Sequence, residues 1–178
     1  TSLDISNNIM LEDLNCVDNV ISRLDLSQNN LLEELNCSGN QLTDLNILDK
    51  KELLRFGCSR NLLTTIDVSG NPLLKDLYCD NNQIVALDIN INQDLKDLNC
   101  ANNQIKYLDV TNNRKLYHFY CYNNLLTSMN ISHNSILTYF DCTDNNIQCI
   151  EINENQIDKV EYFQKDGSAN WSLDCDSN

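Results

Sequence analysis

The 178-residue sequence predicts a right-handed, gently curved solenoid with a parallel β-sheet along its concave face. Three observations predict it: a block of residues recurs every 21 positions, apolar residues fill fixed columns of that block, and one cysteine and one asparagine recur in every copy. A fixed period of this length is typical of repeat proteins, in which each unit is stable only when stacked on its neighbours. We expect the array at residues 1–152, starting in mid-repeat, and a C-terminal cap at residues 153–178.

The first half of each repeat predicts a strand with one buried face. Its leading column is leucine in all seven copies, at Leu11, Leu32, Leu53, Leu74, Leu95, Leu116 and Leu137. A second apolar column lies three residues later, at Leu14, Leu35, Phe56, Leu77, Leu98, Phe119 and Phe140. Apolar and polar residues then alternate, which is typical of a half-buried strand, and stacked copies give an in-register parallel sheet.

Two further columns have no exceptions. The cysteine column lies two residues after the second apolar column, at Cys16, Cys37, Cys58, Cys79, Cys100, Cys121 and Cys142. The asparagine column follows three residues later, at Asn19, Asn40, Asn61, Asn82, Asn103, Asn124 and Asn145. We expect each asparagine to hydrogen-bond the backbone of the turn that leaves the strand, because buried backbone polar groups need partners.

The second half of the repeat predicts short strands or extended turns on the convex side, with little or no helix. It carries two apolar columns, at Leu24, Leu45, Ile66, Leu87, Leu108, Met129 and Ile150, and at Leu26, Ile47, Val68, Ile89, Val110, Ile131 and Ile152. About ten residues are too few for a stable helix. Between the columns lie Asp25, Asn46, Asp67, Asp88, Asp109, Asn130 and Glu151, for which we expect side-chain-to-backbone hydrogen bonds, with weak calcium binding as the minor alternative.

The repeat block, as in "LEELNCSGNQL" at residues 32–42, resembles the LxxLxCxxNxL signature of leucine-rich repeats with cysteine in a leucine position. The short unit with a nested LxxLDVSxN half is similar to repeats of bacterial surface proteins, including a cysteine-bearing member of the internalin family. The closing stretch resembles the ends of such arrays in Bacteroidetes secreted proteins. This resemblance covers residues 1 to about 155 and implies a leucine-rich-repeat scaffold, a fold that serves many kinds of recognition.

The seven column cysteines are expected to form a ladder of reduced, buried thiols. Cysteine behaves as a small hydrophobic residue and is among the most often buried types. Neighbouring rungs lie about 4.8 Å apart with parallel side chains, whereas a disulfide needs Cβ atoms about 3.8 Å apart and directed toward each other. A straight column also does not surround a metal ion tetrahedrally, so we expect no metal and no cofactor.

The two remaining cysteines, Cys149 and Cys175, lie outside the ladder and flank the expected cap. A disulfide between them would hold the last segment on the final coil, and two unpaired thiols are the alternative. Repeat arrays need a cover for their apolar ends. Trp171 with Val160, Tyr162 and Phe163 are the residues expected to supply it. A disulfide would indicate an oxidising compartment.

Composition indicates an exported recognition protein. The net charge of −14 argues against nucleic acid as a partner, and no apolar run is long enough to insert into a membrane. The mid-repeat start indicates a fragment or processed form, so an uncapped N-terminal coil allows weak self-association. We expect an extracellular or cell-surface location, with a protein or a glycan as the partner.

Candidate binding residues lie on or beside the expected sheet toward the C-terminal end. The aromatic members are Tyr78, Tyr117, His118, Tyr120, Tyr122 and Tyr139, and the polar members are Asp76, Asp97, Asn99 and Asp141. Tyrosine is enriched at the centres of protein interfaces, which favours protein binding. Sugar stacking on the rings is the second hypothesis, and aromatic stacking that only stabilises the sheet is the third.

Enzymatic activity is not expected. The chain has two histidines, of which His133 lies in a loop and His118 lies among tyrosines without an evident nucleophile. Carboxylates such as Asp76 and Asp97 would lie on an open surface, whereas catalysis usually needs a cleft.

Overall fold

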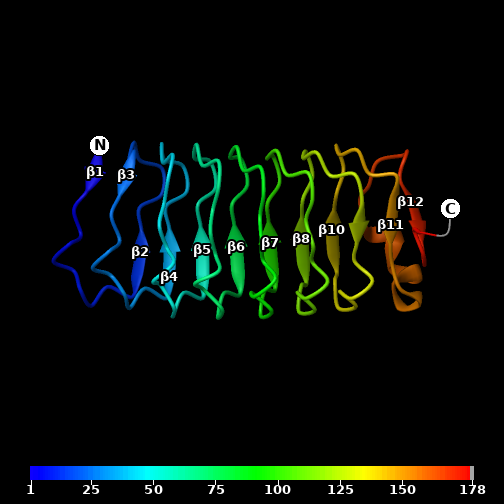
Figure 1. The fold of residues 1–178 in the computed structure, drawn as a ribbon, viewed down its shortest axis with the longest axis horizontal. Helices are drawn as coiled ribbons and strands as arrows, with labels where there is room; N and C mark the ends of the chain where they lie inside the picture. Colours follow the sequence, from blue (N-terminus) through cyan, green and yellow to red (C-terminus); the bar gives the residue numbers. More distant parts are fainter. Residues whose placement is uncertain (177–178) are drawn as a thin grey trace.

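The computed structural model describes residues 1–176 and shows an elongated stack of coils (Figure 1). A seven-stranded parallel sheet, here called the main sheet, runs along it in the order β10-β8-β7-β6-β5-β4-β2. Its strands are β2 (Asp13–Asn15), β4 (Glu34–Asn36), β5 (Arg55–Gly57), β6 (Asp76–Tyr78), β7 (Asp97–Asn99), β8 (His118–Tyr120) and β10 (Tyr139–Asp141). Leu35 pairs with Phe56, and Phe56 with Leu77, so the register equals the sequence period. The predicted leucine-rich-repeat solenoid is confirmed.

The opposite side of the coils carries strands only near the two ends. They are β1 (Ser2–Leu3), β3 (Arg23–Leu24), β9 (Met129–Asn130), β11 (Cys149–Glu151) and β12 (Asn170–Ser172). β1 pairs with β3, while β12, β11 and β9 form a three-stranded sheet. In the central coils this side is extended chain without strand pairing. Within residues 1–176 the only helix is the 3₁₀ helix η1 (Glu154–Tyr162). This agrees with the prediction of little or no helix.

The cysteines lie in the apolar core between the two sides. All seven are free and buried, and Cys58, Cys79 and Cys121 are completely inaccessible. Burial raises the pKa of the thiols, to about 12 for Cys37 and Cys100. A buried thiol with a raised pKa holds little thiolate and acts as an apolar side chain.

We therefore expect the seven ladder thiols to resist a thiol reagent in the native protein and to react once the chain unfolds, because the thiolate is the reacting species. A colorimetric thiol titration in buffer and in guanidinium chloride, without reductant, measures both states. Rapid native modification of interior thiols such as Cys79 would contradict a closed ladder.

The predicted asparagine column bridges neighbouring coils. Asn103 Nδ2 donates to the carbonyl of Cys100 in its own coil and to that of Cys79 in the preceding coil, both at 3.1 Å. Its Oδ1 accepts from the amide of Ile84 at 2.9 Å. The same pattern recurs at Asn40, Asn61, Asn82, Asn124 and Asn145. The expected role of this column is confirmed.

A second asparagine ladder, which the sequence analysis missed, lies in the turn after the outer segment. Asn113 Nδ2 donates to the carbonyls of Ile89 at 3.0 Å and Asn92 at 2.9 Å. Equivalent bonds are made by Asn29, Asn71, Asn92 and Asn134. Gln156 in η1 closes the ladder on the carbonyls of Ile131 and Asn134.

The acidic and amide column of the outer segment caps its own turn. In each case the side-chain Oδ1 accepts the amide two residues later, at Asp25, Asn46, Asp67, Asp88, Asp109 and Asn130. This confirms the expected side-chain-to-backbone role for these six residues, because Asp and Asn favour such local bonds in turns.

The C-terminal segment covers the last coil. Cys149 and Cys175 form a disulfide with Cα atoms 5.9 Å apart. Phe163 is buried and its ring centroid lies 5.7 Å from that of Phe140, while Trp171 lies 6.4 Å from Phe140. The expectation that Tyr162 helps to cover the end was wrong, since it is 69% exposed. Tyr162 is the last residue of η1 and faces solvent, and its hydroxyl hydrogen-bonds the Glu161 carboxylate.

Candidate binding surface

Successive rungs of the main sheet align four of the predicted residues in one column. Asp76 of β6 pairs with Asp97 of β7, Asp97 with His118 of β8, and His118 with Tyr139 of β10. Side chains at equivalent positions of parallel strands point to the same side, about 4.8 Å apart. The alternation in the sequence therefore places the four side chains side by side on the exposed face.

His118 lies at the centre of an aromatic cluster. Its Nδ1 contacts Asp97 Oδ1, and its ring centroid lies 4.6 Å from that of Tyr117 and 5.1 Å from that of Tyr139. Tyr117 and Tyr139 remain 44% and 54% exposed. The Asp97 contact fixes the imidazole between two tyrosine rings whose outer faces are open to a ligand.

Tyr78 and Tyr120 extend this cluster along the neighbouring column. Burial raises the pKa of the Tyr78 hydroxyl, and the carboxylates of Asp97 and Asp76 raise it further. Burial also raises the pKa of Tyr120, followed by the effects of Tyr139 and Asp97. These shared influences show that the phenols and carboxylates lie within electrostatic reach of one another. We call the set comprising Tyr78, Tyr117, His118, Tyr120, Tyr139, Asp76 and Asp97 the aromatic surface.

Replacing Asp76 by asparagine is expected to increase the free energy of unfolding at neutral pH, by less than about 1 kcal/mol. Burial and then the neighbouring Asp97 raise the pKa of Asp76 above its ordinary value of 3.8. The ionised carboxylate therefore destabilises the folded state above its raised pKa. The benefit of asparagine should shrink as pH falls through that pKa and vanish below 3.8.

Urea denaturation of the wild type and Asp76→Asn across the acid range tests this prediction. Asp13→Asn, at an exposed position of the same column, is the matched control and should give a smaller change. A stabilisation by Asp76→Asn that stays constant with pH would contradict the electrostatic explanation.

Three of the sequence-predicted residues are left out of this set, although Asn99 pairs with both Tyr78 and Tyr120 and Asp141 pairs with Tyr120. Asn99 Oδ1 accepts the amide of Ala101 at 3.2 Å, and Asp141 Oδ1 accepts both the amide and the hydroxyl of Thr143, at 3.0 and 2.7 Å. These side chains bond their own turns, which leaves less capacity for a ligand. Tyr122 follows β8, is only half-buried and makes no described ring contact.

The sequence analysis missed a hollow at the N-terminal side of the aromatic surface, lined by both polar and apolar residues. Arg55 forms an ion pair with Glu34 one rung away. Beside it, a hollow of about 280 Å³ lies over Gly57 and is bordered by Tyr78. The sequence contained an indication of this hollow, because Gly57 is the one residue in its column without a side chain.

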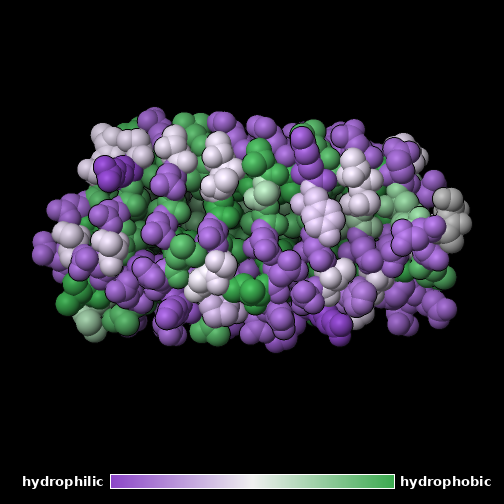
Figure 2. Space-filling view, in the orientation of Figure 1, coloured by the Kyte–Doolittle hydropathy of each residue, from purple (hydrophilic) through white to green (hydrophobic). Residues whose placement is uncertain are grey.

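The described part of the chain offers no evident metal centre or membrane helix. Among residues 1–176, no three His, Cys, Asp or Glu side chains are grouped so that they could hold a metal ion. Over the same residues, no helix has the length and apolar character that crossing a membrane requires. The face in Figure 2 is mostly hydrophilic, with small apolar areas scattered among polar side chains.

Solved structures share this architecture. The functional domain of InlJ from Listeria monocytogenes, which includes a cysteine ladder, matches with 30% identity and a TM-score of 0.62 over 94% of this chain and 46% of that chain. The chain is a leucine-rich-repeat protein similar to the internalins. Internalin C2 from the same organism matches with 21% identity and a TM-score of 0.77, over 93% of this chain and 76% of that one.

A more distant match lies in the Toll–Spätzle complex of Drosophila, with 20% identity and a TM-score of 0.70 over 86% of this chain and 25% of that one. No protein-family model and no curated protein sequence matches the chain. The leucine-rich-repeat chain spans about half the length of InlJ's solved domain. These likenesses agree with a module for protein interaction, and the partner has to be argued from this chain's own surface.

Proposed function

We propose that this leucine-rich-repeat chain is a non-enzymatic recognition module that binds a protein partner through the main sheet, with the aromatic surface at the centre of the contact. The observation that carries the proposal is the ring cluster of Tyr117, His118 and Tyr139 on the exposed face of the main sheet. Tyrosine buries a large area at low entropic cost and is enriched where interfaces are strongest. A chain of the same fold is found with a protein partner in the Toll–Spätzle complex.

Charge defines the expected partner more closely. The sequence has 26 Asp and Glu against 12 Lys and Arg, and Asp76 and Asp97 lie within the aromatic surface. A partner that presents basic groups around an apolar or aromatic centre would complement this surface, and its association should slow as salt rises.

Carbohydrate binding is the second candidate function. It is favoured by one feature, the open faces of Tyr117 and Tyr139 close to the Asp97 carboxylate, since sugars combine an apolar ring face with hydroxyl groups. The hydrogen bonds that Asn99 and Asp141 make to their own turns weigh against it, because these are two of the four side chains, with Asp76 and Asp97, that were expected to bind hydroxyl groups.

We place the protein outside the cell or at the cell surface. The disulfide between Cys149 and Cys175 supports this location, because such bonds persist in oxidising compartments. Exposed apolar side chains on the N-terminal coil, among them Ile9, Met10 and Val20, support weak self-association of the isolated chain.

The test is a parallel screen of the wild type and of Tyr117→Ala/Tyr139→Ala against a panel of extracellular proteins and a glycan array. Tyr107→Ala is the matched control, because this tyrosine is 71% exposed and lies on the outer side of the coils, away from the aromatic surface. Protein hits that the double change abolishes and the control retains are expected. Glycan hits with the same behaviour would support the second candidate, and hits that survive both changes would remove binding from the aromatic surface.

A further inference from the structure

Lys50 interrupts the second asparagine ladder. The residues one coil before and one coil after it are Asn29 and Asn71, and both make the ladder bonds. Lys50 keeps the backbone geometry of that position, since its carbonyl still accepts from Asn71 Nδ2 at 2.8 Å. Its side chain is nevertheless buried, at 2% exposure of the residue. Lys50 therefore occupies a position at which both neighbouring coils have an asparagine side chain.

The ammonium group of Lys50 is under-coordinated. Nζ donates to Asn30 Oδ1 at 2.8 Å, the one hydrogen bond described for it. An ammonium has three donors, and burying a charge without acceptors is costly. Burial accordingly lowers the pKa of Lys50, an effect that the carboxylates of Asp49 and Asp25 partly offset. The other two N–H donors have no described acceptor.

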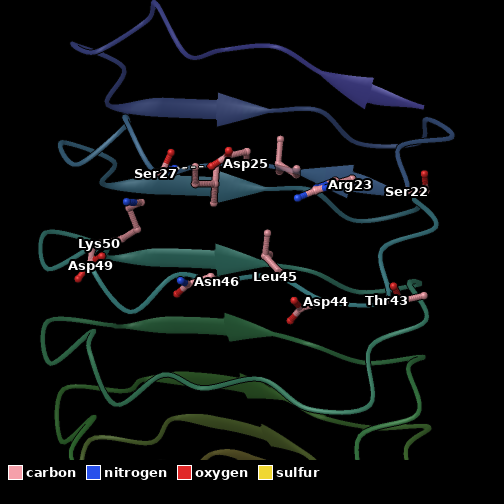
Figure 3. A pocket seen from close by; sticks show the side chains of 12 residues that line it. Ser22, Arg23, Asp25, Ser27, Thr43, Asp44, Leu45, Asn46, Asp49 and Lys50 are labelled. Atoms are coloured by element: carbon pink, nitrogen blue, oxygen red, sulfur yellow. Dashed lines mark hydrogen bonds between the residues drawn. The ribbon is translucent and has the colours of Figure 1, made fainter.

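Lys50 lines a hollow of about 450 Å³ on the side of the coils away from the main sheet. It lies between β3 with the turn after it and the outer segment of the next coil (Figure 3). Lys50 and Asp49 lie toward one end, and Arg23 and Asp44 toward the other (Figure 3). The buried leucines Leu24, Leu26 and Leu45 also line it. Its size is within the range of about 300–1,000 Å³ that small ligands occupy.

The mixture of charges identifies the class of ligand. Arg23 and Lys50 are opposed by Asp25, Asp44 and Asp49, so the lining carries one excess negative charge and does not favour a free anion. The lining thus combines cationic donors and carboxylate acceptors with the side-chain hydroxyls of Ser22, Ser27 and Thr43. A ligand that suits this lining both donates and accepts at many points, which describes a polyhydroxylated molecule.

We propose that this hollow, between β3 and the outer segment of the following coil, binds a small neutral carbohydrate, one or two sugar rings in size. Lys50 Nζ and the Arg23 guanidinium donate to sugar oxygens. The carboxylates of Asp44 and Asp49 accept from hydroxyls. The leucine side chains at the base of the hollow contact the C–H face of a ring. This site is separate from the aromatic surface and independent of the proposed protein binding.

The test is titration of the wild type with glucose, galactose, mannose, N-acetylglucosamine and their common disaccharides, followed by calorimetry and amide NMR. Phosphate and acetate are the anionic comparisons. Lys50→Asn is the decisive variant, because it restores the ladder residue while it removes the ammonium. Lys51→Met is the matched control, a neighbouring exposed lysine that does not line the hollow.

The expected result is saturable binding of at least one neutral sugar, with amide shifts at residues 22–27 and 43–50. Lys50→Asn should weaken it by about tenfold or more, the loss expected for a charged hydrogen bond, and Lys51→Met should leave it unchanged. If Lys50→Asn fails to fold, Lys50→Met provides the same comparison. Absence of sugar binding, stronger binding of the anions, or unchanged affinity in the Lys50 variants would each overturn the proposal. Binding of a protein to the aromatic surface should be unaffected by Lys50→Asn, so the two proposals fail separately.

Discussion

Replacing Asn103 by alanine is expected to lower the free energy of unfolding by about 2–4 kcal/mol. The amide of Ile84 would lose Asn103 Oδ1, its described acceptor, in a buried site. The carbonyls of Cys79 and Cys100 would each lose one of two side-chain donors, since Asn82 and Asn124 still reach them. The cost is therefore dominated by one orphaned amide and the cavity left in the turn.

The position of Asn103 in the middle of the array increases the effect. The side chain ties its coil to the preceding one, and a repeat protein derives its stability from such contacts between neighbours. Urea denaturation followed by circular dichroism measures the change. Asn112→Ala is the control, because its side chain is exposed and its amide donates only to Asn90 at 3.3 Å. Equal losses for the two variants would contradict a bridging role for the ladder.

The solenoid could be predicted because the repeat occurs seven times, so that each position of the coil is represented by seven residues. The cysteine and asparagine columns have no exceptions, and the register between Leu35, Phe56 and Leu77 reproduces their spacing. In such an array, contacts between neighbouring coils follow directly from the period. The alternation within each strand likewise predicted that Asp76, Asp97, His118 and Tyr139 share the outward face.

Departures from the period could not be predicted in the same way. Residues 154–162 belong to no repeat, so no column showed that Tyr162 would end a 3₁₀ helix on its solvent side. Asn99 and Asp141 were placed correctly in the sheet, but their bond to the amide two residues later, which Asn15 and Asn36 of the same column also make, was not predicted.

Lys50 could have been singled out from the sequence but was not. The column that contains Asn29, Asn71 and Asn92 was visible in the sequence, and so was the lysine that interrupts it. In a repeat protein the recurring residues build the scaffold, and a buried exception has to be explained by something other than the fold.

Replacing Phe140 by alanine is expected to lower the free energy of unfolding by about 3–5 kcal/mol. Phe140 is 2% exposed and lies where the last coil of the main sheet meets the C-terminal segment. Its ring centroid is 5.4 Å from that of Phe119 within the array, and 5.7 Å from that of Phe163 in the segment that covers it. Alanine would leave a cavity between these two parts of the chain, because neither can collapse into it without moving the other.

The substitution of Phe140 should also make the C-terminal segment unfold at lower urea than the array. Trp171 is the single tryptophan and lies 6.4 Å from Phe140, so its fluorescence reports on that segment alone. In Phe140→Ala the tryptophan signal should change at lower urea than circular dichroism of the sheet, whereas in the wild type the two should coincide. Tyr162→Ala, in the same segment but exposed, should change stability by less than about 0.5 kcal/mol. Coincident transitions in Phe140→Ala would mean that the segment unfolds with the whole array, held by the disulfide between Cys149 and Cys175 and by pairing of β12 with β11, with no special contribution from the aromatic contact.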